Sequence, residues 1–177
     1  FSILDEARPS QVKKNEALSF DYPPKHSRVV APLLRSRWNQ DHPYSLYTPT
    51  YKDTDGDDQH AFAGCVAVAM AQLMYYHQWP AQGRGEKYHP KLGKRDFSAS
   101  HYRWSDMRPI YGDNERHIGS GKNPGVRPDD DPMFTSVAEL MRDLGAAVSM
   151  NYQPAASSST SELAYSALLT YFDYDAT

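Results

Sequence analysis

A single cysteine, Cys65, stands at the start of the most regular apolar pattern in the chain. Over residues 65–77 apolar side chains recur at intervals of three and four residues, which is the period of a helix with one buried face. Trp79 and Pro80, followed by Gly83, end the pattern. The spacing predicts a helix that begins at the cysteine and buries Val66, Ala69, Met70, Leu73 and Met74.

The residue before this cysteine is Gly64, whose backbone can adopt angles that are closed to other residues. A tight turn at Gly64 would deliver Cys65 to the first turn of the helix. Free N–H groups and the helix dipole stabilise negative charge there, so the thiol is favoured as a thiolate nucleophile. The alternative is a buried structural cysteine, because free cysteine is among the most buried residue types.

Three segments of the chain resemble successive blocks of one protease family. They read WNQDHPYSLYTP at 38–49, QHAFAGCVAVAMAQLMYYHQWP at 59–80 and ELMRDLGAAVSMNYQPAASSSTSELAYSAL at 139–168. These blocks are similar to the streptopain family of secreted bacterial cysteine proteases, which have a papain-like fold. The resemblance runs in order from about Val29 to Thr177. It departs from the family at Ala63, where threonine is expected, and at Ser45, where asparagine is expected.

The resemblance implies an α+β, papain-like fold, of which this chain is mainly the helical half with the nucleophile helix. It also implies a cysteine endopeptidase that acts on proteins or peptides through Cys65 and needs no cofactor. An apolar substrate residue two places before the scissile bond is implied as well. The alternative function is a non-catalytic interaction domain on the same fold, in which Cys65 is structural.

Two glutamines compete for the oxyanion hole of such an enzyme. In the family, the glutamine of the first block donates its side-chain amide to the oxyanion, which implies this role for Gln40. Gln59, six residues before Cys65, has the spacing that papain-type enzymes use. The motif around Gln40 matches the family block more specifically, so we expect Gln40 to be the donor.

A cysteine protease also needs an imidazole within hydrogen-bond reach of the sulfur. The chain has seven histidines, none at a position expected for this base: His26, His42, His60, His77, His89, His101 and His117. In papain-like enzymes the histidine follows the cysteine by about 130–150 residues, which is past Thr177 here. We therefore expect residues 29–177 to be the N-terminal part of a catalytic domain, with the histidine on a continuation or a second polypeptide that forms its C-terminal half.

Residues 1–28 carry charged and turn-forming residues with one short apolar run. The resemblance places the start of the mature enzyme near Val29, so this leader is interpreted as the remnant of an inhibitory propeptide, with cleavage near Lys25 and His26. An ordinary N-terminal extension is the alternative. Secretion is likewise implied by the family.

Composition excludes several other classes of protein. A net charge of −3 and the absence of a long basic run argue against binding to nucleic acid or to an anionic membrane surface. The apolar runs are far shorter than a membrane span, and one cysteine cannot form an internal disulfide. The acidic segment 52–58 lacks the glycine and glutamate positions of an EF-hand, so a solvated loop is expected rather than a cation site.

The remaining pattern predicts few regular elements. Residues 81–131 are expected to be surface loops around an aromatic island at 101–107, with 119–132 an insertion relative to the family. A second helix is predicted from Asp131 and Pro132 to Gly145, then a strand over 146–152. The serine-rich loop at 154–160 is interpreted as part of the substrate cleft or as a flexible linker. A capping box formed by Ser159 and Glu162 predicts a third helix.

Overall fold

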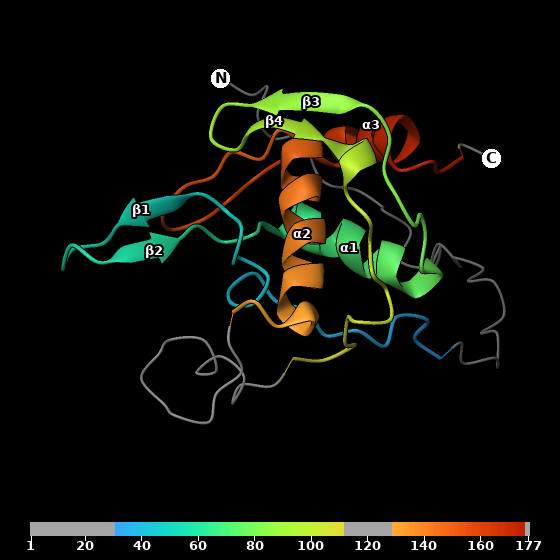
Figure 1. Cartoon of the computed structure of the whole chain (residues 1–177), viewed down its shortest axis with the longest axis horizontal. Coiled ribbons are helices and arrows are strands. Elements are labelled where there is room, and N and C mark those ends of the chain that lie inside the picture. The colour runs from blue at the N-terminus through green and yellow to red at the C-terminus, as the bar shows by residue number, and fades with distance from the viewer. Residues whose placement is uncertain (1–30, 112–128, 176–177) are drawn as a thin grey trace, which may run out of the picture. The chain divides into compact units, whose positions relative to one another are not determined.

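The computed structural model describes residues 31–111 and 129–175 (Figure 1). The predicted leader at 1–28, and most of the predicted insertion at 119–132, lie outside the described residues. The described chain contains three α-helices and two antiparallel hairpins, so it mixes helix and sheet. None of its helices is both long and apolar enough to cross a membrane.

Helix α1 (Cys65–His77) begins at the cysteine, as the sequence predicted. Its buried side chains are Ala67, Val68, Met70, Ala71 and Met74. The predicted face was therefore only partly correct, because Val66 and Leu73 are half-buried and Ala69 is exposed. The alanines allow α1 to pack closely against both α2 and α3. The helix ends at Gln78, which takes a left-handed conformation just before Trp79 and Pro80.

Helix α2 (Pro132–Ala147) is the most deeply buried element and crosses in front of α1 in Figure 1. Its start was predicted correctly: the Asp131 carboxylate accepts the N–H of Met133 at 2.9 Å, and Pro132 occupies the first turn. Its predicted end at Gly145 was wrong, because the helix continues to Ala147. Gly145 is instead a packing position, since a Cβ atom there would collide with the hydroxyl of Tyr152.

The strand predicted over 146–152 does not form. Ala146 and Ala147 belong to α2, Ser149 has a positive φ of 50°, and only Asn151 makes a β-bridge, to Ser158. Helix α3 (Ser161–Tyr171) follows. Its N-cap is Thr160 rather than the predicted Ser159, whose hydroxyl donates to the carbonyl of Val148 instead.

The two hairpins lie on either side of α1 in sequence, and both are antiparallel. Strands β1 (Thr50–Lys52) and β2 (Asp58–His60) enclose the acidic segment, and their pairing places Tyr51 opposite Gln59. Strands β3 (Glu86–His89) and β4 (Gly93–Asp96) pair Lys87 with Arg95 and contact α2 through β3. A short 3-10 helix, η1 (Phe97–Ala99), follows β4. The region predicted to be loops thus contains a hairpin.

A buried ion pair network fastens the β3–β4 hairpin and the aromatic island to α2. The Asp143 carboxylate is fully buried on α2 and lies 3.1 Å from Arg142 Nε and 3.6 Å from Arg95 Nε of β4. The Tyr102 hydroxyl donates to the same carboxylate at 3.2 Å. Burial, with Asp143 alongside, raises the pKa of Tyr102, so this phenol stays protonated as the donor.

Candidate active site

The thiol-bearing residue Cys65 is the first residue of α1 and is exposed to solvent. The first helical hydrogen bond runs from the N–H of Val68 to the carbonyl of Gly64 at 3.0 Å. The free N–H groups of the first turn therefore lie at the same end of the helix as Cys65, and a helix N-terminus stabilises negative charge. The exposed position does not fit the alternative of a buried structural cysteine.

Gly64 is required by two independent constraints. Its φ of 93° lies in the region that side chains other than glycine avoid. A Cβ atom there would also lie 2.6 Å from both the Cε and the Sδ of Met150. The turn that delivers Cys65 to the helix start is therefore packed directly against the segment that follows α2.

Cys65 opens into a pocket of about 520 Å³. Its walls come from three stretches of chain that are far apart in sequence: the segment before β1, the approach to α1 and the loop after α2. The lining residues are Asn39, Gln40, Asp41, Phe62, Cys65, Ala155, Ala156 and Ser157. Phe62 and the two alanines make part of this lining apolar.

Gln40 is held at this pocket by its backbone. Its carbonyl accepts the N–H of Ala63 at 2.8 Å, and its own N–H donates to the Asn39 side chain at 2.9 Å. Trp38 anchors the segment. Its indole is buried, lies 4.9 Å from the Tyr75 ring of α1 with the ring planes tilted by 42°, and donates to the carbonyl of Arg108 at 2.8 Å. Gln40 thus lines the same pocket as the cysteine.

Gln59 lies elsewhere. It is exposed on β2, and its side-chain amide donates to Asp53 Oδ2 at 3.0 Å within the β1–β2 hairpin. It lines a neighbouring pocket of about 350 Å³ together with His42 and His60, not the pocket of Cys65.

Five histidines fall within the described residues, and none of them lines the Cys65 pocket. His42 pairs with Asp129 at 3.1 Å, and His60 lies 3.0 Å from the carbonyl of Thr48. His89 is buried and lies 2.9 Å from the carbonyl of Met150. The His77 ring meets the Tyr174 ring edge-on, and the backbone of His101 forms an isolated β-bridge with Gln82. His26 and His117 lie outside the described residues.

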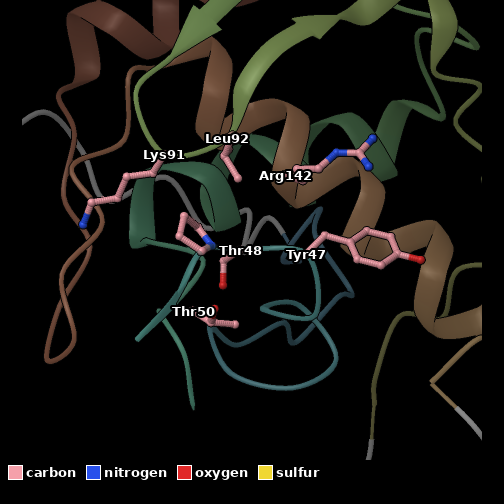
Figure 2. A pocket seen from close by; sticks show the side chains of 7 residues that line it. Tyr47, Thr48, Thr50, Lys91, Leu92 and Arg142 are labelled. Carbon is pink, nitrogen blue, oxygen red and sulfur yellow. The ribbon is translucent and has the colours of Figure 1, made fainter. Parts of the chain in front are cut away.

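A larger pocket of about 740 Å³ lies away from the cysteine, between β1 and the β3–β4 turn (Figure 2). Lys91 and Arg142 contribute to its wall, but Figure 2 shows that their charged groups point away from its centre. The Arg142 guanidinium pairs with Asp143 and Glu139 and lies over the ring of Tyr47. This pocket therefore lacks the convergent polar groups of a reaction site.

The acidic segment of the β1–β2 hairpin closes on itself. The Asp53 carboxylate accepts the N–H groups of Asp57 at 2.9 Å and of Asp55 at 3.0 Å. These bonds, with that of Asp57 the largest cause, hold the pKa of Asp53 below its usual value. Among the described residues no group of three metal-binding side chains comes together.

Sequence reasoning identified Cys65, Gln40 and the loop after α2 but missed Phe62, Asn39 and Asp41 as lining residues. Their positions depend on how the segment before β1 packs across the approach to α1. No local pattern in the sequence encodes that packing, because it arises from a backbone contact between residues 23 positions apart.

Comparison with known proteins finds relatives that are peptidases or proteases. The family model described as "Peptidase C10 family" matches residues 38–177. Streptopain of Streptococcus pyogenes is 31% identical over 96% of this chain and 45% of its own length. The thiol protease/hemagglutinin PrtT of Porphyromonas gingivalis is 26% identical over 82% of this chain and 16% of its own.

Solved structures agree with the sequence relatives. The active wild-type interpain A cysteine protease of Prevotella intermedia matches with a TM-score of 0.62 and 29% identity, covering 81% of this chain and 55% of that one. A prointerpain A fragment from the same organism matches with a TM-score of 0.61 and 27% identity. The predicted α+β, papain-like fold is therefore confirmed.

The chain spans less than half the length of streptopain and about half that of the interpain A chain it matches. Within that span the family model covers the segment that holds Gln40, the helix that begins at Cys65 and the loop that completes their pocket. This chain belongs to the peptidase C10 family.

Proposed function

We propose that this chain is the nucleophile-bearing part of a secreted cysteine endopeptidase. The observation that carries the proposal is one pocket lined by both Gln40 and Cys65, with Cys65 exposed at a helix N-terminus. Relatives of this chain are named as cysteine or thiol proteases.

The reaction begins when the Cys65 thiolate adds to a substrate carbonyl carbon. The carbonyl oxygen becomes an oxyanion, which accepts hydrogen bonds from the Gln40 side-chain amide and the Cys65 backbone N–H. The C–N bond then breaks as an imidazolium gives its proton to the leaving amine, and the resulting thioester is hydrolysed by water. The substrates are proteins or peptides, and the apolar lining from Phe62 and Ala156 favours an apolar residue two places before the scissile bond.

The histidine that supplies this proton comes, in our proposal, from a C-terminal half outside this chain, on a continuation or a second polypeptide. None of the described histidines lines the pocket, which supports this assignment. The half-buried Val66 and Leu73 and the exposed Ala69 of α1 offer an apolar face for that partner to cover. The complete enzyme is this chain together with that half.

We further propose that residues 1–28 are the remnant of an inhibitory propeptide that is removed near Lys25 and His26. Sequencing the N-terminus of the enzyme recovered from culture medium tests both secretion and cleavage. An enzyme retained in the cells would contradict secretion. A fully active enzyme that keeps residues 1–28 would contradict the inhibitory propeptide.

The proposed reaction is tested by casein hydrolysis with the complete enzyme and its Cys65→Ala variant. We expect the variant to lose all measurable activity while its circular dichroism spectrum stays the same. Iodoacetamide should inactivate the wild type with one alkyl group added at Cys65, as read by mass spectrometry. Full activity in Cys65→Ala would instead favour the non-catalytic interaction domain for this chain.

A further inference from the structure

One wall of the Cys65 pocket is a loop whose ends are joined. The N–H of Asn151 donates to the carbonyl of Ser158 at 2.8 Å, and the N–H of Ser158 donates back at 3.2 Å. The loop between them presents Ala155, Ala156 and Ser157 to the pocket. Residues 147–152 lead from the end of α2 into this loop and are called its stem. Side chains that hold the stem therefore set the position of one pocket wall.

The stem is held by three side chains of the β3–β4 hairpin, each of which approaches a main-chain carbonyl. Lys87 Nζ donates to the carbonyl of Ala147 at 2.7 Å, and Lys91 Nζ donates to that of Tyr152 at 2.5 Å. Between them, His89 Nε2 lies 2.9 Å from the carbonyl of Met150. Lys87 and His89 point the same way because alternate residues of a strand share a face.

The tautomer of His89 follows from the hydrogen bonds of its two ring nitrogens. Its Nδ1 accepts the backbone N–H groups of Lys91 at 3.2 Å and Leu92 at 3.3 Å, so Nε2 carries the proton and donates to Met150. The ring is buried and meets the Tyr152 ring edge-on, with 5.5 Å between centroids. Both nitrogens of this histidine are thus used to join the hairpin turn to the loop stem.

The stem is fixed on its other side by α2 and by the cysteine turn. The fully buried Tyr152 places its hydroxyl over Gly145, and Met150 packs on Gly64. In Figure 2 the Lys91 side chain extends away from the 740 Å³ pocket, which leaves its ammonium free to reach the Tyr152 carbonyl. Hairpin, stem and nucleophile turn therefore form one continuous set of contacts.

We infer that the β3–β4 hairpin is a positioning element for substrate binding, in which Lys87, His89 and Lys91 hold the pocket-lining loop in place. This inference rests on the proposed function. These residues do not touch the reacting atoms, so losing them should weaken substrate binding more than it slows the reaction of bound substrate. The hairpin takes no part in the proposed reaction of Cys65 and Gln40.

The test uses the complete enzyme with the double variant Lys87→Met/Lys91→Met, which keeps side-chain length and removes both donors. We expect KM for a peptide substrate to rise about tenfold, the effect of about 1.4 kcal/mol, with kcat changed less than about threefold. Alkylation of Cys65 by iodoacetamide should proceed at the wild-type rate, because that small reagent does not need the loop. The Lys87→Arg/Lys91→Arg variant should restore most of the binding.

The matched control is Lys52→Met/Lys94→Met, which removes two lysines from exposed pairs with Asp58 and Glu86. It should leave KM unchanged. Amide hydrogen exchange supplies a readout independent of activity, and we expect faster exchange at Asn151 and Ser158 in the double variant than in the control. If the double variant and the control have the same KM and the same amide exchange rates at Asn151 and Ser158, the hairpin does not position the loop.

The two proposals fail in different ways. Activity that survives Cys65→Ala overturns the proposed function, and exchange at Asn151 and Ser158 then still decides whether the hairpin holds the loop. If the double variant does not fold, Lys91→Met alone takes its place, because this lysine is exposed and its removal opens no core. An unchanged KM and unchanged exchange in that variant overturn the inference.

Discussion

The backbone N–H of Ala63 donates to the carbonyl oxygen of Gln40 across 2.8 Å. This one hydrogen bond joins the segment before β1 to the residue two places before the nucleophile. It fixes Gln40 at the mouth of the Cys65 pocket, whereas Gln59 is engaged by Asp53 in the β1–β2 hairpin. The geometry therefore favours Gln40 over the glutamine at the papain spacing as the proposed oxyanion donor.

Replacing Gln40 by alanine in the complete enzyme should lower kcat by about 10²- to 10³-fold with little change in KM, the usual loss for one oxyanion donor. Gln59→Ala is the matched control and should have a far smaller effect. Steady-state kinetics of both variants checks this. The reverse ranking would assign the oxyanion hole to Gln59.

Gly64→Ala should reduce both stability and activity. The new methyl group meets Met150 at 2.6 Å and the φ of 93° is unfavourable for alanine, so we expect a loss of about 1–3 kcal/mol in the free energy of unfolding. Urea denaturation measures the loss. Gly56→Ala is the control, because its φ is 85° but no atom lies within 4 Å of a Cβ there. It should leave activity unchanged, and equal kcat losses in the two variants would contradict a specific role for Gly64.

Asp143→Ala should lower the free energy of unfolding by roughly 3 kcal/mol, since it leaves the buried Tyr102 hydroxyl and two arginines without their shared carboxylate. Both arginines are partly exposed, which moderates the loss. Glu86→Ala removes an exposed pair with Lys94 and should cost less than about 1 kcal/mol. Similar urea midpoints for the two variants would show that the network contributes little.

The partly covered face of α1 leads to a prediction about folding. Val66 and Leu73 are half-buried and Ala69 is exposed, and each Å² of apolar surface that stays uncovered forfeits about 25 cal/mol of stabilisation. We therefore expect amides of 65–77 to exchange slowly in the complete enzyme and quickly in the isolated chain. Strong protection in the isolated chain would show that it is a self-sufficient domain.

Local signals in the sequence predicted the elements that local chemistry determines. The glycine before Cys65, the proline after Asp131 and the 3.6-residue period of 65–77 each act over a few residues, and the helices they predict begin where expected. The same signals failed where a distant contact decides. Gly145 resembles a helix end, but it is a glycine because Tyr152 lies over it.

The buried face of α1 was predicted only in part, and the β3–β4 hairpin was missed. Ala67 and Ala71 are buried because α2 and α3 approach them closely, and an alternation of exposed charged residues such as Glu86 and Lys94 gives a weak strand signal. Ser159 fits a capping box by spacing, yet Thr160 caps α3 because Ser159 bonds to Val148. Residue types led to Cys65 as the proposed nucleophile, but the walls of its pocket come from packing.

Reconstitution tests the central claim most directly: this chain supplies the nucleophile and the oxyanion donor, and the histidine comes from outside it. Casein hydrolysis is measured for the pure 177-residue chain, for the C-terminal half and for the two combined. The account predicts no hydrolysis by either half alone and activity in the mixture that Cys65→Ala abolishes. Hydrolysis by the pure chain that is lost in Cys65→Ala would show that one of its own histidines serves as the base, and would contradict the account.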